Sequence, residues 1–148
     1  MTKKIAVELN PKVEALAKYL EVDPSELESS SHDDNTFELG SKEYMVLTDE
    51  EADEKAADYI KDSAWAFNKS FLDGHSEVIS ALDDESWKAI VSRCESSNSV
   101  VLRLIDDVSY FIDDAIAADG RGHFLNTYDD EENEMKLGNE YYFIYRIN

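Results

Sequence analysis

Cysteine is almost absent from this chain of 148 residues, in which Cys94 stands alone. A single cysteine cannot form a disulfide within the chain, which fits a reducing compartment such as the cytosol. His32, His75 and His123 are far apart in sequence, so no closely spaced ligands indicate a zinc site. The acidic segment DDEENE also lacks the glycine and the spacing of a calcium-binding loop. We therefore expect neither a bound metal nor a cofactor.

Long apolar runs and catalytic motifs are missing as well. No run approaches the ~18 apolar residues that a membrane-spanning helix needs, and the opening MTKKIAVELN lacks the apolar core of a signal peptide. Phosphate-binding loops, dinucleotide fingerprints and glycine-flanked nucleophiles are not found. These absences favour a cytoplasmic protein that is not an enzyme.

Positive charge is scarce. Lysine and arginine number 14 against 34 aspartates and glutamates, which gives a formal net charge of -20 at pH 7. Such a surplus produces a negative field over much of the surface, which repels nucleic acids and anionic membranes and attracts basic partners. Because 43% of the residues are hydrophobic, the chain differs from disordered acidic chains and is expected to fold.

Two similar segments, FELGSKEYMVL and MKLGNEYYFIY, each predict a β-hairpin, with turns at residues 40–41 and 138–139. The likeness is open to two interpretations, an internal duplication or two independent solutions to the same turn, and we favour the second. The chain length suits one domain. We expect a single α+β domain in which several helices pack on a small antiparallel sheet built from both hairpins. A helical segment over residues 1–34 precedes the main body over residues 35–148.

Cap residues mark where the longer helices begin. Thr48 and Glu51 have the spacing of a capping box, and the helix that follows is expected to run to about residue 72. Asn98 is expected to cap a long helix over residues 99–118. Shorter helices are expected in NPKVEALAKYLEV, SEVISAL and DESWKAIVSRC.

Acidic residues recur every four positions along the helix predicted from residue 48. Successive carboxylates at this spacing rise ~6 Å along a helix axis, and phosphates of one DNA strand are roughly 6–7 Å apart through space. An acidic helix face can therefore present a DNA-like potential to a DNA-binding site. The alternative is an ordinary solvated face, since Lys55 and Lys61 also have acidic neighbours at pairing distance. The acidic row consists of Glu50, Glu54, Asp58 and Asp62.

Two further acidic clusters extend this candidate surface. One is expected on the outer side of the long helix, where pairs of aspartates repeat every seven residues, and the other lies in a loop near the C-terminus. Together with the acidic row they are the candidate partner-binding carboxylates, taking the place of phosphates. The two clusters are Asp106, Asp107, Asp113 and Asp114, and Asp129, Asp130, Glu131 and Glu132.

Two other segments offer alternative sites. The segment DGRGHF holds Asp119, Arg121 and His123, from which an acid–base pair can be imagined, although a helix end followed by a strand start is the simpler interpretation. Aromatic residues alternate along the last predicted strand, and they are expected to form core and rim, or a protein interface. These residues are Tyr141, Tyr142, Phe143 and Tyr145.

The segments KEYMVLTDEEADEKAADYIKDSAWAFN and AADGRGHFLNTYDDEENE…YYFIYRIN resemble small acidic proteins encoded by bacteriophages. The resemblance covers most of the chain past residue 36, and it carries no functional residues over. It implies a phage origin and a place in the host cytoplasm. Very acidic phage proteins include DNA mimics that block restriction enzymes, CRISPR effectors or other DNA-binding proteins, which is an analogy of class rather than of fold.

The leading hypothesis is a non-enzymatic DNA mimic of the anti-restriction or anti-defence type. It would act as an inhibitor that occludes a basic, nucleic-acid-binding surface of a host protein, without binding nucleic acid or membrane itself. The first alternative is a protein–protein interaction module that binds through an apolar or tyrosine-rich patch, with a homodimer as one form. The second alternative is a small-molecule binder or enzyme built around Asp119 and His123.

Overall fold

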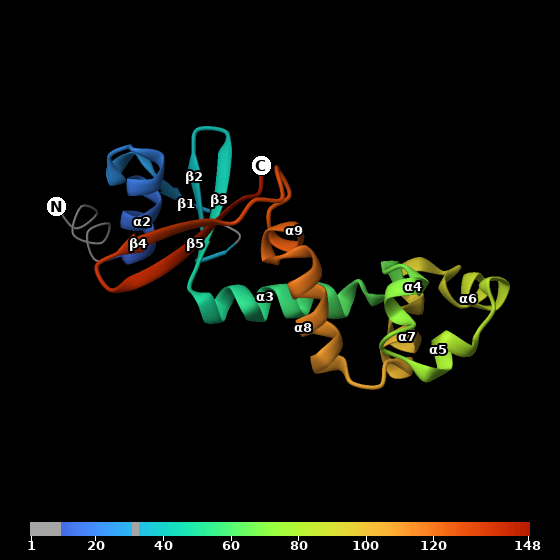
Figure 1. Ribbon diagram of the computed structural model, residues 1–148. Coiled ribbons are helices and arrows are strands. Elements are labelled where there is room, and N and C mark those ends of the chain that lie inside the picture. The colour runs from blue at the N-terminus through green and yellow to red at the C-terminus, as the bar shows by residue number, and fades with distance from the viewer. Residues whose placement is uncertain (1–9, 31–32) are drawn as a thin grey trace. The chain divides into compact units, whose positions relative to one another are not determined.

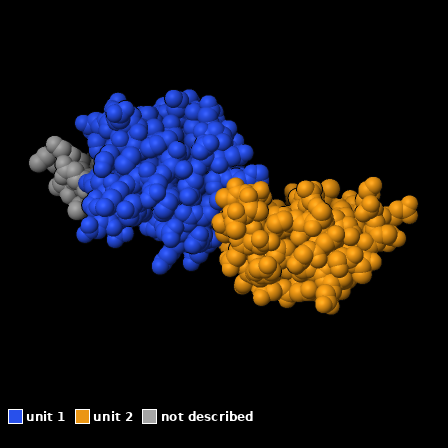
Figure 2. All heavy atoms as spheres, viewed as in Figure 1, with its two compact units in different colours: residues 1–55, 121–148 blue, residues 56–120 orange. Residues whose placement is uncertain are grey.

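The computed structural model describes residues 10–30 and 33–148 (Figure 1). Within them the chain is α+β, as the sequence predicts, with helices accompanying one antiparallel sheet of five strands. The chain divides into two compact units, residues 1–55 with 121–148, and residues 56–120 (Figure 2). We call them unit 1 and unit 2, and each is described by itself. The boundary predicted between residues 34 and 35 falls inside unit 1.

The sheet of unit 1 joins the two predicted hairpins, both of which are confirmed. The strand order is β1-β2-β3-β5-β4, and every neighbouring pair is antiparallel. Gly40 and Gly138 adopt positive φ angles of 62° and 65° in the two turns, a conformation that glycine adopts without a steric penalty. The strands are β1 (Glu28–Ser29), β2 (Thr36–Leu39), β3 (Lys42–Leu47), β4 (Asn133–Leu137) and β5 (Glu140–Arg146).

Helix α2 (Pro11–Leu20) packs against β3, β4 and β5, so the helical segment near the N-terminus belongs to the same core as the sheet. The side chain of Asn10 caps this helix by accepting a hydrogen bond from the backbone N–H of Lys12. A short 3-10 helix, η1 (Pro24–Glu26), follows with Asp23 as its cap. The core includes Val13, Leu16, Phe37, Tyr44, Val46, Tyr142 and Ile144.

Helix α3 (Asp49–Asp62) begins as predicted and ends earlier than predicted. Its capping box is confirmed, because the N–H of Thr48 donates to Glu51 Oε1 at 2.9 Å and the N–H of Glu51 donates to Thr48 Oγ1 at 3.3 Å. The expected continuation to residue 72 is wrong. The chain instead forms η2 (Ala64–Ala66) and then α4 (Lys69–Leu72).

Asn98 explains why α3 stops. In a continuing helix the N–H of Trp65 would donate to the carbonyl of Lys61, four residues earlier. The side-chain amide of Asn98 takes both partners, since its Nδ2 donates to Lys61 O at 2.7 Å and its Oδ1 accepts from Trp65 N at 3.1 Å. The expected role of Asn98 as a helix cap is therefore wrong, because its side chain bonds to the end of α3.

The long helix expected over residues 99–118 is also two helices, α7 (Asn98–Leu104) and α8 (Val108–Asp119). Asp107 caps α8 by accepting a hydrogen bond from Tyr110 N, and the N–H of Asp106 donates to His75 O at 2.9 Å. The Asp107 cap and the hydrogen bond from Asp106 to His75 stabilise a break between the two helices. Helical periodicity in the sequence does not reveal this break. Asp106 and Asp107 consequently do not share a helix face with Asp113.

Unit 2 also contains three shorter helical segments and a cluster of aromatic rings. The predicted α5 (Glu77–Ala81) and α6 (Asp84–Val91) are confirmed, and η3 (Cys94–Ser97) precedes α7. Phe111 packs edge-on against Phe67 with ring centroids 5.0 Å apart, and against His75 at 5.6 Å. Over the described residues no helix has the length and apolar character required to cross a lipid bilayer.

Candidate functional site

The acidic row on α3 lies on an exposed helix face, as predicted. Glu50, Glu54, Asp58 and Asp62 are all exposed. Asp58 forms an ion pair with Lys61, whose Nζ lies 3.6 Å from Asp58 Oδ1. The other three have no ion-pair partner among the described residues. The division between the units falls after Lys55, so Glu50 and Glu54 belong to unit 1 and the other two to unit 2.

Other carboxylates of α3 are neutralised within unit 1. Glu51 accepts from Lys12 Nζ at 2.7 Å, and Arg121 Nη1 lies 2.8 Å from Asp49 Oδ1 and 3.0 Å from Asp53 Oδ1. The charge that α3 presents to a partner is therefore concentrated on fewer residues than its composition suggests.

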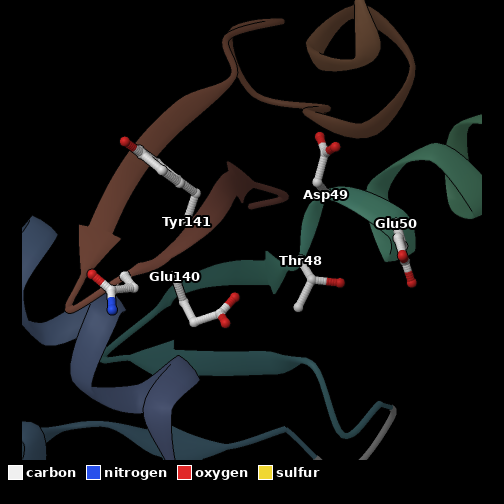
Figure 3. Close-up of a pocket in the computed structure, with 6 residues that line it drawn as sticks. Thr48, Asp49, Glu50, Glu140 and Tyr141 are labelled. Carbon is white, nitrogen blue, oxygen red and sulfur yellow. The ribbon is translucent and has the colours of Figure 1, made fainter.

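The unpaired charge of Glu50 borders a hollow of about 430 Å³ in unit 1 (Figure 3). Asp49 and Glu50 leave the start of α3 in different directions, and Glu140 extends from β5 toward Thr48 (Figure 3). Tyr141 adds an aromatic ring that is 46% exposed. We call this the Glu140 hollow, and it is lined by Thr48, Asp49, Glu50, Asn139, Glu140 and Tyr141.

The Glu140 hollow has the chemistry of a cation-accepting surface. Carboxylates accept hydrogen bonds from ammonium and guanidinium groups, and a tyrosine ring attracts cations to its face. Within the chain, Lys136 Nζ already lies 5.5 Å from the centroid of the Tyr141 ring. A partner's cation would therefore have to compete with Lys136 for this ring.

Arg121 organises the carboxylates beside this surface. Its side chain is only 10% exposed, its Nε donates to Glu132 Oε1 at 2.8 Å, and its guanidinium lies 4.6 Å from the centroid of the Phe143 ring. Burial lowers the pKa of Arg121, but hydrogen bonds to Glu132 and Asp49 outweigh this effect and raise it, so the charge is permanent. Sequence patterning missed these contacts; the only hint is that Arg121 is one of four arginines in an acidic chain.

Tyr145 completes this arrangement from the sheet. Its hydroxyl donates to the same Oε1 atom of Glu132 that Arg121 contacts. Burial raises the pKa of Tyr145, and the adjacent carboxylate of Glu132 raises it further, so the phenol stays protonated as a donor. We call the set Arg121, Asp49, Asp53, Glu132 and Tyr145 the Arg121 network.

The DGRGHF segment forms α9 (Arg121–Leu125) rather than the start of a strand. His123 Nδ1 lies 3.9 Å from Asp130, and the guanidinium of Arg121 is occupied by the Arg121 network. Asp119 ends α8 and belongs to unit 2. The charged neighbour of His123 is thus a different aspartate from the predicted one. In the described part of the chain, no three His, Cys, Asp or Glu residues are arranged to hold a metal ion.

The aspartates predicted on the long helix have separate structural roles. Asp114 Oδ2 accepts a hydrogen bond from His75 Nε2 at 2.7 Å, and the His75 side chain is 2% exposed. Asp106 accepts from the N–H of Glu77, while Asp113 is exposed and has no bonding partner in the described residues. These contacts leave Asp113 as the member most available to a partner.

The loop cluster is likewise divided between structure and surface. Asp129 accepts from the N–H of Glu131, and Asp130 has a φ of 62° in the left-handed region. Glu132 is held by Arg121 and Tyr145, so its charge is internally compensated. Glu131 is exposed and has no ion-pair partner among the described residues.

The predicted tyrosine surface is only partly available. Tyr142 and Tyr145 are buried in unit 1, whereas Tyr128 is 58% exposed with the guanidinium of Arg146 stacked 3.5 Å from its ring centroid. In unit 2, Tyr59 and Tyr110 are 51% and 58% exposed. The structure of each unit therefore divides the aromatic residues between the core and the surface.

Glu51 should make stability depend on acid pH. Burial raises the pKa of its carboxyl, but hydrogen bonds from Lys12 and Thr48 outweigh burial and lower the pKa below the ordinary 4.5. Because the folded-state pKa lies below the unfolded one, this stabilisation is complete above pH 4.5 and is lost as pH falls through the folded value. Glu51→Gln should cost about 1 kcal/mol at pH 7, since solvent screens a side chain that is 38% exposed.

The measurement is urea unfolding of both proteins from pH 7 to pH 3. The cost of Glu51→Gln should shrink as pH falls, because the natural carboxyl then becomes protonated as well. Glu50→Gln is the matched control, since this neighbouring carboxylate is exposed, and it should change stability little at any pH. A cost for Glu51→Gln that stays constant across the range would contradict the assignment.

The described surfaces offer unpaired carboxylates and exposed aromatic rings, a combination suited to binding cations and basic proteins. Acidic residues outnumber basic ones in each unit, so each unit has a negative formal charge. No family model, curated protein or solved structure matches the chain, and its function is inferred from these surfaces.

Proposed function

We propose that this protein is a phage-encoded, non-enzymatic inhibitor that acts in the host cytoplasm. It binds a basic, nucleic-acid-binding surface of a host protein and so prevents nucleic acid from binding there. It thus acts as a DNA mimic of the anti-defence type. The observation that supports this proposal best is the pair Glu50 and Glu54, exposed one helical turn apart on α3 without an internal cation. Glu140 adds a further carboxylate beside the start of the same helix.

The Arg121 network supports the proposal by holding the start of α3 in place. Arg121 joins α9 to Asp49 and Asp53 on α3 and to Glu132 ahead of β4, so the free carboxylates project from a fixed frame. Charges held in place before binding lose less conformational freedom when the partner docks. The negative field also steers a basic partner toward the surface, which speeds association.

The test is capture of partners from a host lysate at low salt, followed by elution with a salt gradient and mass spectrometry. A DNA-binding or nuclease complex should be recovered, and duplex DNA should compete with it. Affinity should fall by roughly tenfold or more between 50 and 200 mM salt, since several ion pairs are broken. Binding that ignores both salt and DNA would sink the proposal.

Variants that neutralise chosen carboxylates identify the surface that binds the partner. The triple variant Glu50→Gln, Glu54→Gln, Asp62→Asn should weaken capture by roughly tenfold or more, because three unpaired carboxylates are lost. A control removes the same charge from exposed positions on three other elements, and it should weaken capture by less than about threefold. Equal losses in the two variants would mean that net charge, and not the acidic row, governs binding. The control is Glu28→Gln, Glu85→Gln, Glu134→Gln.

A second candidate is an interaction module that binds through aromatic residues. Tyr59 and Tyr110 of unit 2 favour it, because each exposes more than half of its surface. Such a module, including a homodimer, would resist salt and would tolerate neutralisation of the acidic row. The same capture experiment therefore separates the two candidates.

A further inference from the structure

Unit 2 contains a hollow of about 570 Å³, which shares Asp62 with the acidic row. It lies where α3 ends and η3 approaches, and its walls combine two aromatic rings with two carboxylates. Tyr59 is 51% exposed and Trp65 is half-buried, so part of each residue is accessible to solvent. We call it the Trp65 hollow, and it is lined by Tyr59, Asp62, Ser63, Trp65, Ala66, Glu95 and Asn98.

We propose that the Trp65 hollow binds the side chain of an arginine presented by a basic partner protein. A guanidinium is planar, so it can stack on an aromatic face while its N–H groups donate to carboxylates at its edge. Trp65 and Tyr59 supply the faces, and Asp62 and Glu95 supply the acceptors. Trp is the side chain whose ring attracts cations most strongly.

Charge complementarity selects a cation over other ligands. Every ionisable group with a formal charge among the lining residues is a carboxylate, so an anionic ligand would meet only repulsion. Lys61, the nearest lysine in sequence, is paired with Asp58 and is not a lining residue. This distinguishes the Trp65 hollow from the Glu140 hollow, where Lys136 already lies near the tyrosine ring.

Hydrogen bonds within unit 2 hold the backbone of the Trp65 hollow in place without a ligand. The amide of Asn98 bonds to Lys61 O and Trp65 N, which fixes the backbone on both sides of Asp62 and Ser63. The hydroxyl of Ser63 donates to Tyr59 O at 2.7 Å, which joins Ser63 to the backbone one helical turn earlier. A preformed site lowers the entropic cost of binding a small group.

The inference deepens the proposed function, because it rests on a basic partner and names the side chain that unit 2 would accept. It can be tested without that partner. The probe is Nα-acetyl-arginine amide, whose guanidinium is its only charge, titrated into the full 15N-labelled chain and followed by NMR. The neutral isostere Nα-acetyl-citrulline amide is the control probe, since it has nearly the same shape.

The arginine probe should produce saturable shifts at the Trp65 indole N–H and at the backbone N–H groups of Ser63, Glu95 and Asn98. Saturation is expected at millimolar concentration, because a single cation gains little binding free energy at a partly exposed site. The citrulline probe should produce none. The corresponding lysine probe should bind roughly two- to fivefold more weakly, because an ammonium does not stack as a plane. Equal binding of all three probes would overturn the inference.

Variants make the test specific to the hollow. Trp65→Leu and Glu95→Gln should each weaken the arginine probe by roughly two- to fivefold. Glu95 is exposed, so Glu95→Gln stays informative if Trp65→Leu fails to fold. Asp84→Asn, an exposed carboxylate of unit 2 outside the hollow, is the matched control and should leave affinity unchanged. Shifts spread evenly over all acidic segments, or unchanged affinity in Glu95→Gln, would refute a specific site.

The failures of the two proposals are distinguishable. If the probe saturates the Trp65 hollow while a captured partner ignores salt and DNA, the arginine site stands and the DNA-mimic function falls. If partner binding is salt-sensitive and competed by DNA while the probe shows no saturable shift, the function stands and the arginine site falls.

Discussion

Replacing Gly122 with alanine is expected to lower the free energy of unfolding by about 3 kcal/mol. Gly122 is buried in α9 against the backbone of the acidic loop. An added Cβ would lie 2.8 Å from the carbonyl carbon of Glu131 and 2.9 Å from the nitrogen of Glu132, with the carbonyl oxygen of Asp130 nearer still. These are backbone atoms, so no flexible side chain can turn aside to relieve the clash.

Urea unfolding of the full chain measures this cost. Gly74→Ala is the matched control, because the nearest atom to its Cβ is Phe71 O at 3.6 Å, an ordinary contact. Gly74 also lacks the positive φ that favours glycine, so its replacement should change stability by less than about 1 kcal/mol. If the two variants unfold at the same urea concentration, the loop does not pack on α9 as described.

Arg121→Met should destabilise the protein by about 2 to 3 kcal/mol. The variant keeps much of the side-chain length but leaves Glu132, Asp49 and Asp53 without their shared cation. Removing one partner of a buried ion pair costs about 3–5 kcal/mol. A lower value is expected here because the two aspartates are 70% and 62% exposed and water screens them.

Two comparisons identify the cause of this loss. Arg121→Lys keeps the charge but loses the planar fork that reaches Glu132 and the aspartates together, so an intermediate cost is expected. Arg103→Met removes an exposed arginine of α7 and should change stability by less than about 0.5 kcal/mol. Equal losses for Arg121→Met and Arg103→Met in urea unfolding would contradict the Arg121 network.

The sequence predicted features that depend on neighbouring residues. Both hairpins and the Thr48–Glu51 capping box follow from turn and cap residues within a few positions. The end of α3 and the break before α8 depend on distant partners and were missed. Asn98 acts on α3 from 33 and 37 residues away, and no periodicity within residues 49–72 contains that information.

In the candidate site, too, features set by neighbouring residues were predictable and features set by distant residues were not. The four-residue spacing of the acidic row predicted its exposure, because spacing within one helix determines a shared face. Spacing could not tell which carboxylates remain unpaired. Glu51 is neutralised by Lys12, 39 residues away, and Asp49 by Arg121, 72 residues away. Those pairings require the fold, as does the meeting of Trp65 with Glu95 in one hollow.

The position of β5 between β3 and β4 has a consequence for synthesis on the ribosome. The chain emerges from its N-terminus, so β3 and the whole of residues 56–120 are made before β5. During that interval one edge of β3 has backbone groups without their native partner, and such an edge can pair with a neighbouring nascent chain. The acidic surplus opposes that encounter, because like-charged chains repel each other. Negative charge would thus protect the protein before any partner is present.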